Sequence, residues 1–159
     1  MKKTNNNKGF TLVELIVVLV ILAILAAILV PALLGYIDRA REKQYVLNAK
    51  SALTATQAEF SSLYGEGKSI TAASIAARAT TISSTADTPE DTHFYVKLET
   101  TAAKQAAIAD NHASFTVKEA YYTEKGFYCV FDGTSWQTFS KEADFTAAGF
   151  TAGDYTQIY

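Results

Sequence analysis

The hydrophobic residues of this chain are concentrated near its N-terminal end. From Leu15 to Leu34 the sequence reads LIVVLVILAILAAILVPALL, twenty residues without a charged or strongly polar side chain. A helix needs about 20 apolar residues to cross the hydrocarbon core of a bilayer. Lys2, Lys3 and Lys8 precede this run, and the positive-inside rule places such residues on the cytoplasmic side. The pattern predicts one membrane-spanning helix, with the C-terminal bulk of the chain outside.

After this run the pattern changes to a helix with one apolar face. Residues 38–43 are mostly charged and fit a membrane surface, and no proline or glycine occurs between residues 36 and 64. Apolar residues then recur at spacings of three, four or seven, which is typical of an amphipathic helix. We expect one helix from about Leu12 to Leu63, bent or broken near Pro31 and ended by the glycines of residues 65–67. The predicted apolar stripe comprises Val46, Ala49, Leu53, Phe60 and Leu63.

Shorter elements are expected beyond the long helix. Ser69–Thr92 is rich in Ser, Thr and Ala and is interpreted as a surface connection with a short helix at Thr71–Ala79. Alternating segments follow, separated by turn signals at Glu124–Gly126 and at Asp132-Gly133. We predict an α+β fold, in which an antiparallel sheet of three or four strands lies on the apolar stripe. The expected elements are strands at Phe94–Glu99, Ser114–Thr123, Phe127–Asp132 and Ser135–Ser140 and a helix at Thr100–Asp110, with Phe127, Phe131, Trp136 and Phe139 as core candidates.

The C-terminal tail has aromatic residues at a spacing of five, namely Phe145, Phe150 and Tyr155. Cys129 is the single cysteine, so no internal disulfide can fasten this tail. We expect the three aromatic side chains to anchor the tail instead. Cys129 itself is predicted to be a small buried residue of a strand.

Glu14 is the only charged residue between Gly9 and Ile37. A carboxylate within a membrane span costs on the order of 2.5–3.5 kcal/mol near the centre and less near an interface. Two interpretations are open. Glu14 is either an interfacial residue that reaches the headgroups, or a carboxylate that awaits a cation, such as a newly cut α-amine at Phe10 of a neighbouring chain.

Residues 8–15, KGFTLVEL, resemble the processing signature of type IV prepilins and the related pseudopilins, and the resemblance extends over about residues 2–36. It implies that a membrane peptidase cuts between Gly9 and Phe10 and then methylates the new α-amine of Phe10. It also implies that Glu14, the fifth residue of the mature chain, pairs with a neighbour's terminal amine during assembly.

The same resemblance gives a meaning to Pro31, which occupies the twenty-second mature position, where the family often carries a proline. Together with Gly35, Pro31 marks an expected kink or region of local melting in the assembled helix. The implied organisation is a leader at 1–9, a membrane or filament-core helix at 10–37, and a head at 38–159. Within the head we expect a helix at 38–64, a connection at 65–93, a sheet region at 94–140 and a tail at 141–159.

The resemblance implies a structural subunit of a type IV pilus that serves adhesion, motility or biofilm formation. Its partners would be other copies of the chain, a prepilin peptidase, an assembly ATPase with its platform protein, and the membrane before assembly. The precursor would cross the cytoplasmic membrane once, with its N-terminus in the cytoplasm, and the mature chain would be extracellular in the pilus.

The N-terminal pattern has three other interpretations. A pseudopilin of a secretion or competence system shares the N-terminus, although the size of the head favours a pilin. A signal-anchored binding domain that never polymerises fits the hydropathy equally well. A cleaved secretory signal fits poorly, because its apolar region would be only about 7–15 residues long.

The sequence contains no motif for catalysis, cofactor binding or metal binding, so an enzyme is disfavoured. His93 and His112 lack neighbouring ligands and are interpreted as loop residues. Loss of the leader would change the formal net charge from −2 to −5, which argues against nucleic acid as a partner and leaves only a local basic patch as a route to DNA.

Overall fold

The computed structural model describes residues 9–97 and 115–159. The chain divides into two compact units, with the boundary between Arg41 and Glu42. Helix α1, Leu12–Gly65, belongs to both units. The expected helix at Thr100–Asp110 lies outside the described residues.

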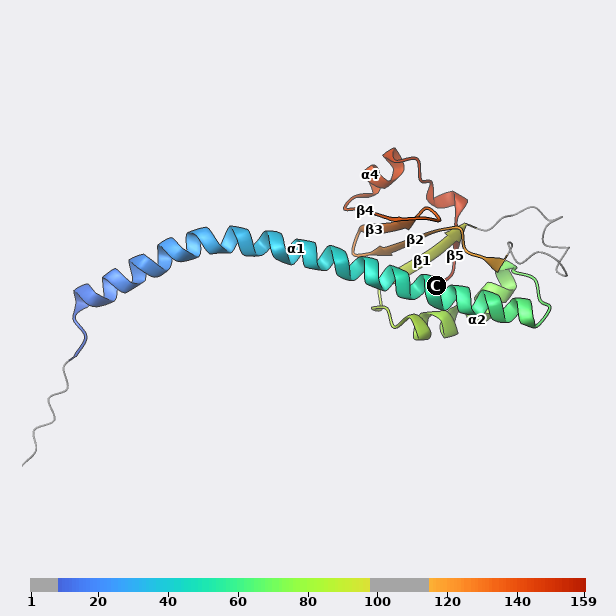
Figure 1. The fold of residues 1–159 in the computed structure, drawn as a ribbon, viewed down its shortest axis with the longest axis horizontal. Helices are drawn as coiled ribbons and strands as arrows, with labels where there is room; N and C mark the ends of the chain where they lie inside the picture. The colour runs from blue at the N-terminus through green and yellow to red at the C-terminus, as the bar shows by residue number, and fades with distance from the viewer. Residues whose placement is uncertain (1–8, 98–114) are drawn as a thin grey trace, which may run out of the picture. The chain divides into compact units, whose positions relative to one another are not determined.

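Helix α1 is unbroken in the single chain. The helix continues through Pro31 and Gly35 and curves without interruption (Figure 1). Of the two forms expected near Pro31, a bend or a break, the break is therefore absent here. Pro31 removes only one N–H from the hydrogen-bond ladder, and in an apolar stretch any further opening would expose more unpaired backbone groups.

In the second unit, the buried face of α1 is built largely from small side chains. Ala49, Phe60 and Leu63 of the predicted stripe are buried, whereas Val46 and Leu53 are only partly buried. The prediction missed three buried residues, because alanine and threonine give a weak hydrophobic signal. These are Ala52, Ala55 and Thr56.

The segment after α1 was expected to be a surface connection with a short helix. It is instead a helix that packs into the core. Helix α2, Ala72–Ala86, is almost twice as long as the predicted one. It begins with a capping box in which Thr71 and Ser74 exchange side-chain and backbone hydrogen bonds. Its isoleucines at 75 and 82 are buried in the core. These two apolar residues, seven positions apart, indicated a buried helix face that the Ser/Thr/Ala-rich composition obscured.

The predicted antiparallel sheet is confirmed, but it has five strands rather than three or four, in the order β4-β3-β2-β1-β5. The predicted strand at Ser114–Thr123 begins only at Glu119. The turn at Glu124–Gly126 is confirmed, with positive φ angles of 51° at Lys125 and 80° at Gly126, as in a type I′ turn. The strands are β1 Thr92–Lys97, β2 Glu119–Glu124, β3 Phe127–Phe131, β4 Trp136–Phe139 and β5 Thr156–Gln157.

The two faces of the sheet are covered differently (Figure 1). One face packs on α1 and α2 and buries Phe94, Ala120, Tyr122 and Cys129. The opposite face is covered by the C-terminal tail, which contains α4 Glu142–Ala147, the short helix η2 Ala152–Asp154 and β5. The long helix α1 and the antiparallel sheet together confirm the predicted α+β fold.

The core candidates chosen from the sequence lie at the border of the core rather than in its centre. Phe127, Phe131, Trp136 and Phe139 are all partly buried and pack against the buried clusters. The fully buried large side chains lie on α1, α2, the three inner strands β1, β2 and β3, and the tail. They include Tyr122, Phe60, Phe94, Phe145 and Ile82.

Candidate N-terminal assembly site

The peptide bond between Gly9 and Phe10 lies ahead of α1 in exposed, non-helical chain. A Cβ atom added to Gly9 would meet no other described atom within 4 Å. In the described part of the chain, nothing therefore requires glycine at this position. A requirement imposed by an external protein, such as a peptidase that must approach the backbone, would explain it.

Glu14 forms a second capping box, with Thr11. Thr11 is the residue before α1, and its carbonyl accepts the first helical hydrogen bond, from the N–H of Leu15 at 3.2 Å. The Thr11 N–H donates to Glu14 Oε2 at 2.9 Å, and the Thr11 hydroxyl donates to the same oxygen at 2.6 Å. In return the Glu14 N–H donates to Thr11 Oγ1 at 3.3 Å. The carboxylate is thus held at the first turn of α1, where the helix dipole favours negative charge.

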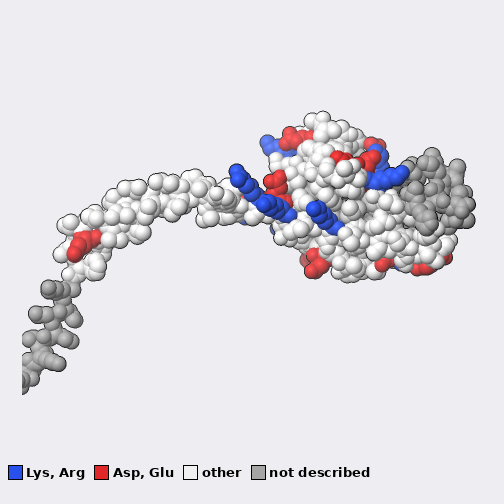
Figure 2. Space-filling view, viewed as in Figure 1, with Lys and Arg blue, Asp and Glu red and all other residues white. Residues whose placement is uncertain are grey.

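The apolar part of α1 has no protein cover in the single chain. The large hydrophobic side chains between Phe10 and Ile37 are between 39% and 82% exposed. On the face seen in Figure 2 this surface is uncharged apart from one acidic patch near its start, and Glu14 is the only charged residue between Gly9 and Ile37. A helix that is apolar on all sides belongs in a membrane or inside an assembly, and α1 is long and apolar enough to cross a membrane.

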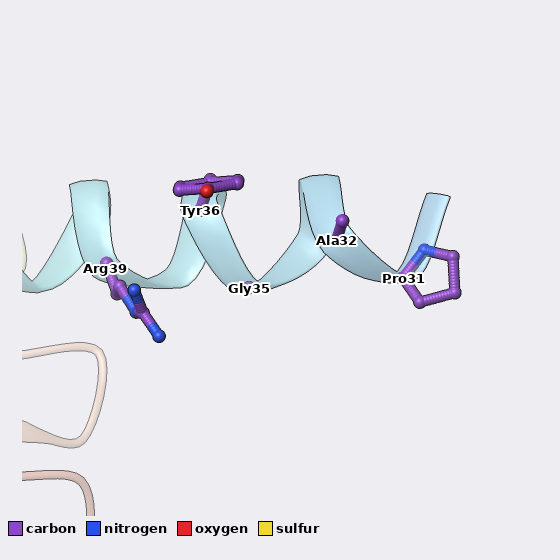
Figure 3. Close-up of a pocket in the computed structure, with 5 residues that line it drawn as sticks. All are labelled: Pro31, Ala32, Gly35, Tyr36 and Arg39. Atoms are coloured by element: carbon purple, nitrogen blue, oxygen red, sulfur yellow. The ribbon is translucent and has the colours of Figure 1, made fainter. Parts of the chain in front are cut away.

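An open groove of about 300 Å³ lies on α1 at Pro31 and Gly35. Pro31, Gly35 and Arg39 follow one another one turn apart, and the missing side chain at Gly35 leaves a gap between the other two (Figure 3). A Cβ at Gly35 would meet nothing within 4 Å, so the single chain does not require glycine there. Because Pro31 has no N–H, the carbonyl of Ala27 also lacks its usual helical donor.

Residues 4–30 match the family model of the prokaryotic N-terminal methylation motif. This motif is the signature of type IV pilins and prepilins, and the match supports a precursor similar to a type IV pilin or a pseudopilin. Comparison of the chain with curated proteins and with solved structures gave no match. The motif implies processing by a prepilin peptidase and points to a structural protein, and together with the apolar helix it fits a membrane-anchored precursor.

The described residues outside this site include few candidates for metal binding or catalysis. Among the described residues, no group of His, Cys, Asp or Glu could hold a metal ion. Cys129 is fully buried in β3, as predicted, and burial raises the pKa of its thiol to about 12. His93 lies in strand β1 and not in a loop, which corrects the prediction, and His112 lies outside the described residues.

Sequence reasoning singled out Gly9, Phe10, Glu14, Pro31 and Gly35, and all five lie in the first unit of the chain. It missed Thr11. The signal was present, because a threonine followed three residues later by glutamate, directly before an apolar run, is the pattern of a capping box.

Proposed function

We propose that this chain is the precursor of a structural subunit of a type IV pilus. The peptidase cuts between Gly9 and Phe10 and methylates Phe10, and the mature subunit polymerises through α1 into an extracellular filament. The single observation that carries the proposal is the uncovered apolar part of α1, which begins within the methylation motif at residues 4–30. A cut ahead of this helix keeps it, so it can leave the lipid only by burial against other subunits.

The proposed roles of the other residues follow from this order of events. Glu14 pairs with the terminal amine of a neighbouring subunit, and Pro31 with Gly35 allows the helix to kink or melt as it packs. Residues 1–9 are the leader, 10–37 the membrane and filament-core segment, and 38–159 the head outside the membrane. The assembly ATPase and its platform protein are the partners that drive extraction from the membrane.

Mass spectrometry of the N-terminal peptide from cell-associated material tests the proposal. The expected peptide begins at Phe10 and is one methyl group heavier than the unmodified form. A peptide that begins at Met1 would indicate a plain membrane anchor, and one that begins after the apolar run would indicate a secreted domain. Either result would refute the proposal.

Two variants sharpen this experiment. Gly9→Val should block the cut without disturbing the fold, since a side chain at Gly9 meets no other atom. Glu14→Ala should leave the cut intact and reduce filament assembly. Electron microscopy of sheared surface material then distinguishes long pili from the short filament of a pseudopilin, which would leave no surface fibres at native expression.

A further inference from the structure

We infer that Thr11 is a positioning residue for Glu14, which it holds so that one carboxylate oxygen is presented to a cationic group of a second copy of the chain. The inference rests on the proposed function, because it names the residue that prepares Glu14 for the contact between subunits. Thr11 acts through Glu14 and does not itself touch the second copy.

The hydrogen bonds of Glu14 are distributed unequally between its two oxygens. Oε2 accepts both the amide and the hydroxyl of Thr11, at 2.9 and 2.6 Å. Within the described residues, Oε1 has no hydrogen-bond partner. A carboxylate has about four lone-pair sites, so the contact with Thr11 leaves Oε1 free to accept a donor from outside the chain.

The exposure of this site agrees with an external partner. Thr11 and Glu14 are both exposed, and Phe10 beside them is 82% exposed. No cationic side chain lies between Gly9 and Ile37, so a second copy of the same segment can offer a charge only at its chain terminus. The free amine of a processed chain would supply that charge.

The cut leaves both donors of Glu14 in the chain. The bond that breaks joins Gly9 to Phe10, whereas the groups that hold Glu14 are the hydroxyl and the amide of Thr11, on the far side of Phe10. Both groups are therefore present in the precursor and in the mature chain. A flexible Glu side chain loses rotamer freedom when it pairs, and fixing it beforehand lowers that cost.

The two substitutions Thr11→Val and Thr11→Ser separate this role from shape and packing. Valine keeps the β-branched shape but has no hydroxyl, and serine keeps the hydroxyl. Each full-length variant is co-expressed with the wild-type chain in a filament-forming host. The ratio of variant to wild-type peptides is then measured in the sheared filaments and in the membrane fraction.

We expect Thr11→Val to be cut and methylated like the wild type but to enter filaments on the order of tenfold less well, since a hydrogen bond to a charged group is lost. Thr11→Ser should enter within about twofold of the wild type. In the Glu14→Ala background, Thr11→Val should cause no further loss, because two residues that act as a unit are not additive.

Three results of the incorporation assay would overturn the inference. The first is that Thr11→Val enters filaments as well as the wild type does. The second is that Thr11→Ser enters filaments no better than Thr11→Val. The third is that Thr11→Val reduces entry by the same factor in the Glu14→Ala background. Loss of cleavage in Thr11→Val would also overturn it, because Thr11 would then act on the peptidase. Failure of the proposed function itself looks different, since the wild-type chain would keep Met1 or form no filament.

Discussion

The carboxylate of Glu124 joins α1 to the sheet through Asn48. Glu124 is only 5% exposed, and its Oε2 accepts a hydrogen bond from Asn48 Nδ2 at 3.0 Å. The hydroxyl of Tyr122 donates to the same oxygen at 2.7 Å. Because a buried carboxylate is costly without donors, a shift of α1 along the sheet by one turn would remove one of its two partners. This contact therefore helps to fix the position of the helix.

Tyr122→Phe should lower the free energy of unfolding by about 1.5–3 kcal/mol, since it removes a hydrogen bond to a buried charged group. Burial, together with Glu124, raises the pKa of the Tyr122 hydroxyl, so this hydroxyl remains a donor at neutral pH. Urea unfolding of the fragment 42–159 would measure the change. Tyr128→Phe is the control, because among the described residues the Tyr128 hydroxyl has no hydrogen-bond partner. Equal effects of the two substitutions would contradict the role of Glu124.

Thr56→Val should stabilise the protein by about 1 kcal/mol. Thr56 lies in the buried face of α1 with 0% exposure, and its hydroxyl has no hydrogen-bond partner. A buried hydroxyl without a partner costs about 1–3 kcal/mol, and valine has nearly the same shape. Thermal unfolding would show the gain as a higher Tm.

The matched control for this prediction is Thr54→Val on the same helix. Thr54 is exposed, and its hydroxyl donates to the carbonyl of Lys50 at 2.9 Å. The change at Thr54 should stay within about 0.5 kcal/mol, as is usual for surface substitutions. A loss of stability in Thr56→Val would mean that the hydroxyl has a partner, such as a buried water molecule.

The sequence predicted the parts of this fold that have a strong pattern. The apolar run, the amphipathic continuation and the turn at Lys125-Gly126 each follow from one local rule. The sequence failed where burial depends on partners that are far away in the chain. Thr56 and Ala52 give only a weak apolar signal, yet both are fully buried in the folded unit. Helix α2 was hidden by its Ser/Thr/Ala composition.

The residues of the candidate assembly site were nearly all chosen from local sequence, because the motif at residues 8–15 includes the start of α1. Only Thr11 was missed, although Thr11 and Glu14 have the spacing of a capping box. The expected break at Pro31 is not present in the single chain. Melting at Pro31 and Gly35 stays a prediction about the assembled state, where contacts between subunits replace the solvent or lipid around α1.

Phe145→Ala should destabilise the second unit by about 3–5 kcal/mol, as is usual for a large-to-small change in a core. Phe145 is 2% exposed, and its ring lies 5.0 Å from that of Tyr128 and 5.2 Å from that of Tyr121. Truncation after Gly149, which removes β5, should also cost several kcal/mol. Thr146→Ala on the same short helix is the control, since Thr146 is exposed. An unchanged Tm in Phe145→Ala would refute aromatic anchoring of the tail.

Asp132 should contribute to stability in a pH-dependent way. Its Oδ1 accepts the N–H groups of Ser135 at 2.8 Å and Thr134 at 2.9 Å, and its Oδ2 accepts the hydroxyl of Ser135 at 3.0 Å. These bonds, with the backbone bond from Ser135 first, lower the pKa of Asp132 from its ordinary value of 3.8 to about 2. Because the folded pKa is depressed, the stabilisation is complete above about pH 4 and disappears as the pH falls to about 2.

Asp132→Asn isolates this effect from the other carboxyls that titrate in acid, such as Glu66, whose pKa Lys68 and Arg78 lower to about 2. Asparagine keeps an oxygen that can accept both backbone N–H groups but carries no titrating charge. The wild type should therefore be more stable than Asp132→Asn at pH 6, and the difference should shrink between pH 4 and pH 2. Urea unfolding of both proteins across this range measures it. A difference that stays constant down to pH 2 would show that the ionised carboxylate does not stabilise this turn.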